Sequence, residues 1–180
     1  MTKVKLHRLP YIGIPVIGAA IYLLKAGKTD LFILLLCEIL TIFGYIAAIL
    51  DIKLKRIPNN LILAMFVSWI LVLTPKLFID TETAVRLLID SVLGLLAGGG
   101  IFLLMYIISR KGLGGGDVKF IAATGLYVGF SGILTVMLCG TVLAALTGLV
   151  LILLKKIGRK ESIPLVPFLY LGILITVFFT

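Results

Sequence analysis

Two aspartates are the residues whose types and positions best fit catalysis. Asp51 follows a long apolar run and begins the segment DIKLKRIPNN, and Asp117 ends the glycine cluster in GLGGGDVK. Each lies where an apolar stretch meets a short basic segment. Two carboxylates in one site can share a proton, so that one activates water while the other acts as an acid. Such a pair is the minimum requirement for an aspartic protease at a membrane surface.

Each aspartate also has a purely structural interpretation. Asp51 is alternatively a polar residue at the end of a helix, although the helix dipole disfavours a carboxylate there. Asp117 is alternatively a cap after a glycine turn. The glycines Gly114, Gly115 and Gly116 favour a functional role, because glycine permits unusual backbone angles and close approach of another chain.

Four further residues near the aspartates are expected to support them. They are Lys53, Lys119, Pro58 and Asn59. The lysines either tune the aspartates or meet an acidic group on a substrate, and alternatively they belong to the basic loops of a membrane protein. Pro58 and Asn59 predict entry into a helix, with Asn59 as its cap.

The elements that position these residues are predicted to be membrane-spanning helices. The chain has 180 residues, of which 61% are hydrophobic, and its mean hydropathy is +1.24. Its charges gather in short gaps between apolar runs, each of a length that spans a bilayer. We expect one all-α integral-membrane domain over residues 1–180, a polytopic bundle of about six to seven spans by this length rule. The predicted spans are 9–24, 31–50, 60–79, 84–108, 117–130, 132–154 and 163–180.

One apolar run is too long for a single span. A helix from Phe120 to Leu154 would be about 50 Å long, against a hydrocarbon core of about 30 Å. The chain must therefore turn back, and Gly129–Gly132 is the predicted turn. Small residues also recur at four-residue spacing, which predicts closely packed helices. They are Gly94, Gly98, Gly125, Gly129, Gly140, Ala144 and Gly148.

The basic residues predict the orientation of the chain. Thirteen of the 17 lysines and arginines fall in the alternate connections that also hold Asp51 and Asp117, and four fall on the other side. Because basic loops stay in the cytoplasm, both aspartates are expected at the cytoplasmic face of the plasma membrane. The net charge of +9 is explained by this arrangement, so we expect a lipid bilayer and no nucleic acid as partner.

Other catalytic chemistries have little support in the sequence. The chain has two cysteines, Cys37 and Cys139, and one histidine, His7, so no metal site or cofactor is expected. Glu38 lies inside the second predicted span, where it is either an interior polar contact or part of a transport path. A small transporter or channel component is therefore the alternative function. A structural subunit of a secretion system without activity is a further alternative.

The sequence resembles the type IV prepilin peptidases, a group of GxGD intramembrane aspartyl proteases. GGGD at Gly114–Asp117 is similar to the GxGD motif, and Asp51 followed by basic residues and Ile57-Pro58-Asn59 is similar to the first aspartate motif. IPLVPFLYLG near the C-terminus resembles the last helix of that family. The resemblance covers roughly residues 31–180.

This resemblance implies a reaction and a substrate. Asp51 and Asp117 would form the catalytic pair of an endopeptidase that removes the leader of prepilins or prepilin-like proteins in type IV pilus or secretion systems. The substrate would be a single-span protein with a short polar or basic leader. Long members of the family carry a cytoplasmic insertion with paired CxxC motifs, associated with N-methylation. This sequence lacks both, so it resembles the short form, and methyltransferase activity is not expected.

Overall fold

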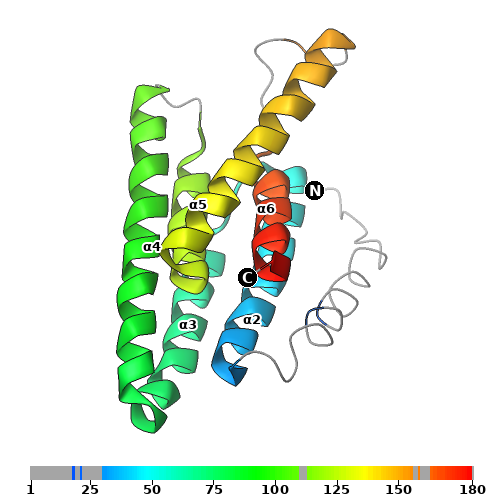
Figure 1. Cartoon of the computed structure of the whole chain (residues 1–180). Coiled ribbons are helices and arrows are strands. Elements are labelled where there is room, and N and C mark those ends of the chain that lie inside the picture. Colours follow the sequence, from blue (N-terminus) through cyan, green and yellow to red (C-terminus); the bar gives the residue numbers. More distant parts are fainter. Residues whose placement is uncertain are drawn as a thin grey trace.

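The described part of the protein is an all-helical bundle. The computed structural model describes residues 18, 21, 30–109, 113–155, 158 and 163–179, which contain no strand. The helices, shown in Figure 1, are α2 (Leu31–Leu54), α3 (Asn59–Ile79), α4 (Thr81–Ile108), α5 (Gly115–Leu153) and α6 (Val166–Phe179). The predicted all-α fold is thus confirmed.

The helices follow the predicted spans closely. The spans 31–50, 60–79 and 84–108 correspond to α2, α3 and α4, while 9–24 lies outside the described residues apart from Gly18 and Ile21. Four of the helices are long and apolar enough to cross a membrane, and α6 is a shorter apolar helix. The total of six to seven spans therefore stays a prediction.

Polar residues at the helix ends fix where α2 and α4 begin. Asp30 caps α2 by accepting a hydrogen bond from the amide of Phe32, and Asp80 caps α4 by accepting one from the amide of Thr83. Asp30 also pairs with Lys76 near the end of α3. This hydrogen bond from Lys76 holds the pKa of Asp30 below its ordinary value. The same polar contact joins the start of α2 to the end of α3.

The predicted cap of α3 is wrong. Pro58 occupies the N-cap position with an extended backbone, and no side chain caps the helix there. Asn59 is already the first helical residue, and its side chain accepts a hydrogen bond from Lys119 instead of capping the helix.

The long apolar run turns back where the glycines predicted it. Gly129 has φ 68° and ψ −172°, which breaks α5 into two helical segments. The second segment returns toward the end of the bundle where α5 begins (Figure 1), and Gly148 lies near Ile163, just before α6. Asp90 of α4 stabilises the turn, because its Oδ1 accepts a hydrogen bond of 3.0 Å from the amide of Phe130.

Substituting alanine for Gly129 is expected to destabilise the fold. A Cβ there would lie 1.8 Å from Asp90 Oδ2, and the positive φ is disfavoured for any residue with a side chain. We expect a loss of at least about 2 kcal/mol, measured as lower thermal stability in detergent. The matched control is Gly100→Ala, because a Cβ at Gly100 meets no atom within 4 Å. Equal stability of the two variants would contradict this account of the turn.

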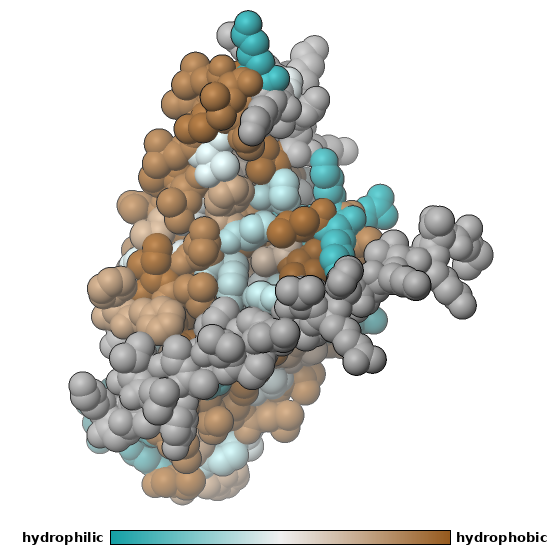
Figure 2. All heavy atoms as spheres, turned by 90° about the vertical axis from the view of Figure 1, so that its right-hand side faces the viewer, coloured by the Kyte–Doolittle hydropathy of each residue, from teal (hydrophilic) through white to brown (hydrophobic). Residues whose placement is uncertain are grey.

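Glycines also bring α4 and α5 into backbone contact. A Cβ on Gly94 would lie 2.3 Å from the carbonyl oxygen of Gly125, and one on Gly125 would lie 2.2 Å from that of Gly94. The predicted close packing at small residues is thus confirmed for this pair. Large hydrophobic side chains remain exposed on the outside of the helices, as expected for lipid-facing surfaces, and hydrophobic residues predominate on the face drawn in Figure 2.

Candidate active site

Asp51 is buried between the end of α2 and the start of α6. Asp51 is only 6% exposed, and its Oδ2 accepts a hydrogen bond of 3.0 Å from the amide of Val166. Val166 is the first residue of α6, and the N-terminus of a helix favours a negative charge. The unfavourable position of Asp51 near the end of its own helix is therefore compensated by a helix that begins 115 residues later.

Asp117 lies half-buried in the first turn of α5. Its Oδ2 accepts a hydrogen bond of 3.2 Å from the amide of Gly114, which is the N-cap residue of the helix. Asp117 is therefore not the N-cap itself but the third residue of the helix, and its side chain caps the first turn from that position. This contact involves one of the two carboxylate oxygens, Oδ2.

The fold brings the two aspartates together. Asp51 and Asp117 line the same two cavities, of about 320 and 280 Å³, and Lys55 and Gly114 line both as well. The two carboxylates are close enough to interact electrostatically. Two carboxylates in one partly enclosed site favour a shared proton over two full charges.

The two cavities differ in their remaining walls. The first, here named the α6 cavity, is completed by Leu113 and by the segment Ile163–Leu165 that leads into α6. The second, here named the glycine cavity, is completed by Arg56, Ile57 and the pair Gly115–Gly116. Because both aspartates line both cavities, an extended peptide lying in the two cavities would pass close to both carboxylates.

The glycines before Asp117 do not adopt the unusual backbone angles that we expected. Gly114 has φ −75°, and Gly129 is the one described glycine with a positive φ. Instead, the absence of a Cβ at these glycines leaves room beside the backbone. A Cβ on Gly114 would lie 2.9 Å from Asp117 Oδ2, whereas one on Gly115 would meet nothing within 4 Å. The glycine cavity is therefore open beside the backbone of Gly115.

The four residues predicted to support the aspartates, which are Lys53, Pro58, Asn59 and Lys119, occupy different places around the site. Lys119 Nζ donates a hydrogen bond of 3.0 Å to Asn59 Oδ1, which links the first turns of α5 and α3. Lys53 is exposed and lines neither cavity. Pro58 lies with Asn59 in an open depression beside the glycine cavity.

Lys55 lines both cavities, whereas Lys53, a lysine that the sequence predicts to support the aspartates, lines neither. Lys55 lies just past the end of α2 in a left-handed conformation, so helical spacing from Asp51 does not predict its position. Lys53 lies two positions from Asp51 and faces elsewhere.

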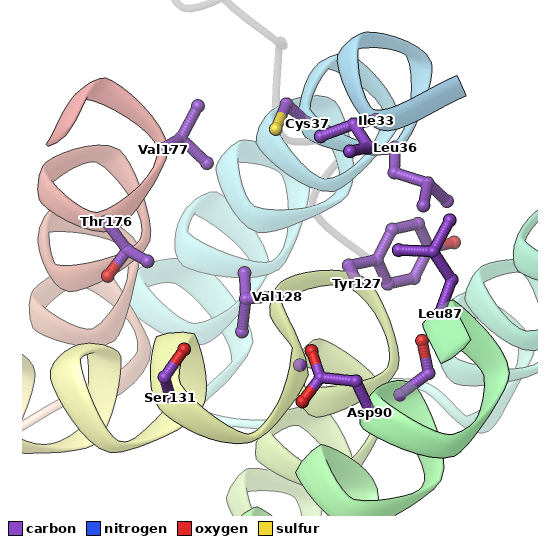
Figure 3. Close-up of a pocket in the computed structure, with 12 residues that line it drawn as sticks. Ile33, Leu36, Cys37, Leu87, Asp90, Tyr127, Val128, Ser131, Thr176 and Val177 are labelled. Carbon is purple, nitrogen blue, oxygen red and sulfur yellow. The ribbon is translucent and has the colours of Figure 1, made fainter. Parts of the chain in front are cut away.

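Another cavity, of about 250 Å³, lies at the opposite end of the bundle (Figure 3). It is mainly apolar, and two of its polar side chains already serve the fold. Asp90 binds the amide of Phe130, and Tyr127 donates a hydrogen bond of 2.6 Å to the carbonyl of Met65. Glu38 lines neither this cavity nor the two beside the aspartates. Among the described residues, no three His, Cys, Asp or Glu side chains form a group that could hold a metal ion.

Comparison with known proteins identifies the family. Residues 38–152, which include both aspartates, match the type IV leader peptidase family. A protein of Legionella pneumophila named prepilin leader peptidase/N-methyltransferase is 27% identical over 145 residues, covering 80% of this chain and 50% of that protein. Relatives of the same name in Aeromonas salmonicida and Aeromonas hydrophila are each 32% identical over 85 residues, covering 44% of this chain and 29% of theirs. No solved structure matches the chain.

The chain belongs to the type IV leader peptidase family. It is a peptidase-family protein, and four of its described helices are long and apolar enough to cross a membrane, as the resemblance implied. The chain spans half or less of the length of the curated relatives it matches.

Proposed function

We propose that this protein is an aspartic endopeptidase that removes the leader peptide of a prepilin, pseudopilin or preflagellin at the cytoplasmic border of the membrane. The observation that carries the proposal is that Asp51 and Asp117 line the same two cavities. Membership of the type IV leader peptidase family supports the class of reaction. The names of the curated relatives support a prepilin as the substrate.

The proposed mechanism uses water and the two carboxylates. The ionised aspartate takes a proton from a water molecule, whose oxygen forms a bond to the scissile carbonyl carbon. The protonated aspartate donates its proton to the carbonyl oxygen, which gives a gem-diol and reverses the protonation of the pair. Collapse of the gem-diol breaks the carbon–nitrogen bond: the leaving nitrogen takes the proton held by the pair, and a hydroxyl of the gem-diol gives its proton to the ionised aspartate, which restores the single shared proton. No cofactor takes part in these steps.

The substrate is proposed to be a single-span protein with a short leader. Its cleavage site would lie as an extended strand in the α6 cavity and the glycine cavity, beside the polar end of its apolar helix. The proposal covers peptide cleavage alone and not N-methylation, because the two cysteines of these 180 residues, Cys37 and Cys139, do not form a CxxC motif.

Co-expression with a candidate prepilin tests the proposal. Leader removal is measured by mass spectrometry of the substrate, with an empty vector as the control. We expect a product shortened by the leader, with a new N-terminus at a single peptide bond. Intact substrate with every prepilin tried, in cells that accumulate the folded protein, would refute the proposed activity.

The proposed orientation gives a separate prediction. After Cys37 and Cys139 are replaced by alanine, single cysteines at the exposed neutral positions Asn60, Ser109 and Thr81 report the side of the membrane. We expect a membrane-impermeant maleimide to label Thr81→Cys on intact cells, and Asn60→Cys and Ser109→Cys only after lysis. Labelling of Asn60→Cys and Ser109→Cys from outside would reverse the proposed orientation.

A further inference from the structure

Lys55 has a backbone conformation that lysine rarely adopts. With φ 50° and ψ 34° it lies in the left-handed region at the C-cap of α2, a position at which glycine or asparagine is usual. A residue held in such a conformation at a functional site is a candidate for a specific role. Lys155 has a similar φ of 54°, and Lys55 is the one of the two that lines the α6 cavity and the glycine cavity.

The conformation places Lys55 beside Asp51. The amide of Lys55 donates a hydrogen bond of 2.9 Å to the carbonyl of Asp51, which closes the last turn of α2. The side chain lines both the α6 cavity and the glycine cavity. Its charge is close enough to interact with the carboxylate of Asp51.

The two carboxylates consequently have unequal surroundings. Asp51 accepts the amide of Val166 at the start of α6 and also has the Lys55 ammonium nearby. Asp117 of α5 accepts the amide of Gly114 in its own first turn. Both carboxylates accept an amide at a helix N-terminus, and Lys55, which is hydrogen-bonded to the backbone of Asp51 in the last turn of α2, is the cation on the Asp51 side of the site. Arg56 is a further cation in the wall of the glycine cavity.

We propose that Lys55 is a positioning residue that keeps Asp51 as the ionised member of the pair. Asp51 is then the base that takes the proton from water, and Asp117 is the acid that protonates the carbonyl oxygen of the substrate. This assignment rests on the proposed peptidase function. When two carboxylates share one proton, a lysine charge close to one of them favours the ionised form of that carboxylate. The shared proton then resides on the other carboxylate.

Substitution of Lys55 by asparagine tests the proposal. Asparagine tolerates the left-handed conformation, so Lys55→Asn removes the charge and preserves the backbone. We expect the acid limb of the pH profile of kcat/KM to move by about 0.5–1 pH unit to higher pH, because Asp51 binds a proton more readily without the cation. Lys55→Arg keeps the charge and should retain the profile of the wild type.

Lys155 provides a matched control. It is an exposed lysine with φ 54°, at the end of α5, and it lines neither cavity. Lys155→Asn therefore makes the same change in charge at a similar backbone conformation, and its profile should equal that of the wild type. Raised salt should move the wild-type acid limb toward that of Lys55→Asn, because salt screens exposed charges.

Two results would overturn the proposal. One is an unchanged acid limb in Lys55→Asn, and the other is an equal shift in Lys155→Asn. Both presuppose a wild-type protein that cleaves its substrate and loses activity without Asp51 or Asp117. If the wild type does not cleave, or cleaves without its aspartates, the proposed peptidase function fails instead. The two failures are thus distinguishable in one set of measurements.

Discussion

Asp51→Asn and Asp117→Asn are each expected to abolish leader removal, with turnover at least about 100-fold below that of the wild type. Each substitution removes a group that must either take the proton of water or donate one to the carbonyl oxygen. Because the two carboxylates act as a unit, the double variant should be no less active than either single variant. The measurement is product formed per folded enzyme, with substrate in excess.

These variants are expected to fold. An asparagine at position 51 can still accept the hydrogen bond from the amide of Val166, and one at position 117 can accept that from Gly114. Asp90→Asn is the matched control, because it makes the same change at the opposite end of the bundle and should cleave normally. Activity above a tenth of the wild-type value in Asp51→Asn or Asp117→Asn would remove that residue from the proposed catalytic pair.

Much of the bundle could be predicted because the physical signal is local. Apolar runs interrupted by charged segments define α2, α3 and α4, and the excessive length of the run after Phe120 predicts a turn. Asp51 and Asp117 are separated by two predicted spans, and an even number of spans returns a chain to the same side. This even number of spans alone predicts that Asp51 and Asp117 lie at the same end of the bundle, and in the structure they do.

The remaining features depend on contacts between residues far apart in sequence. The amide of Val166 compensates the charge of Asp51 across 115 residues, and Asp90 stabilises the turn at Gly129 across 40. No periodicity in the sequence encodes either contact. For the glycines before Asp117, the expectation of unusual backbone angles was wrong, because the sequence does not show which of two properties of glycine a position uses. Glycine tolerates a positive φ, and it leaves space.

Gly115→Val is expected to lower kcat/KM at least about tenfold without lowering stability. A Cβ at Gly115 meets no atom of the protein within 4 Å, so the valine has room in the free enzyme. The same space lies in the glycine cavity beside Asp117, where we propose that the backbone of the substrate approaches. A branched side chain would occupy that space and hold the scissile bond away from the carboxylates. The measurement is the initial rate of leader removal, normalised to folded enzyme in detergent.

Three further variants test whether the effect of Gly115→Val arises in the glycine cavity. Gly100→Val adds the same side chain to α4, also with no atom within 4 Å of its Cβ, and should leave turnover unchanged. Gly114→Ala places a Cβ 2.9 Å from Asp117 Oδ2, so it should lower kcat by displacing the carboxylate, whereas Gly115→Ala should act mainly through KM. If Gly115→Val cleaves as fast as the wild type, the substrate backbone does not pass over the first turn of α5, and the α6 cavity is left as the path to the aspartates.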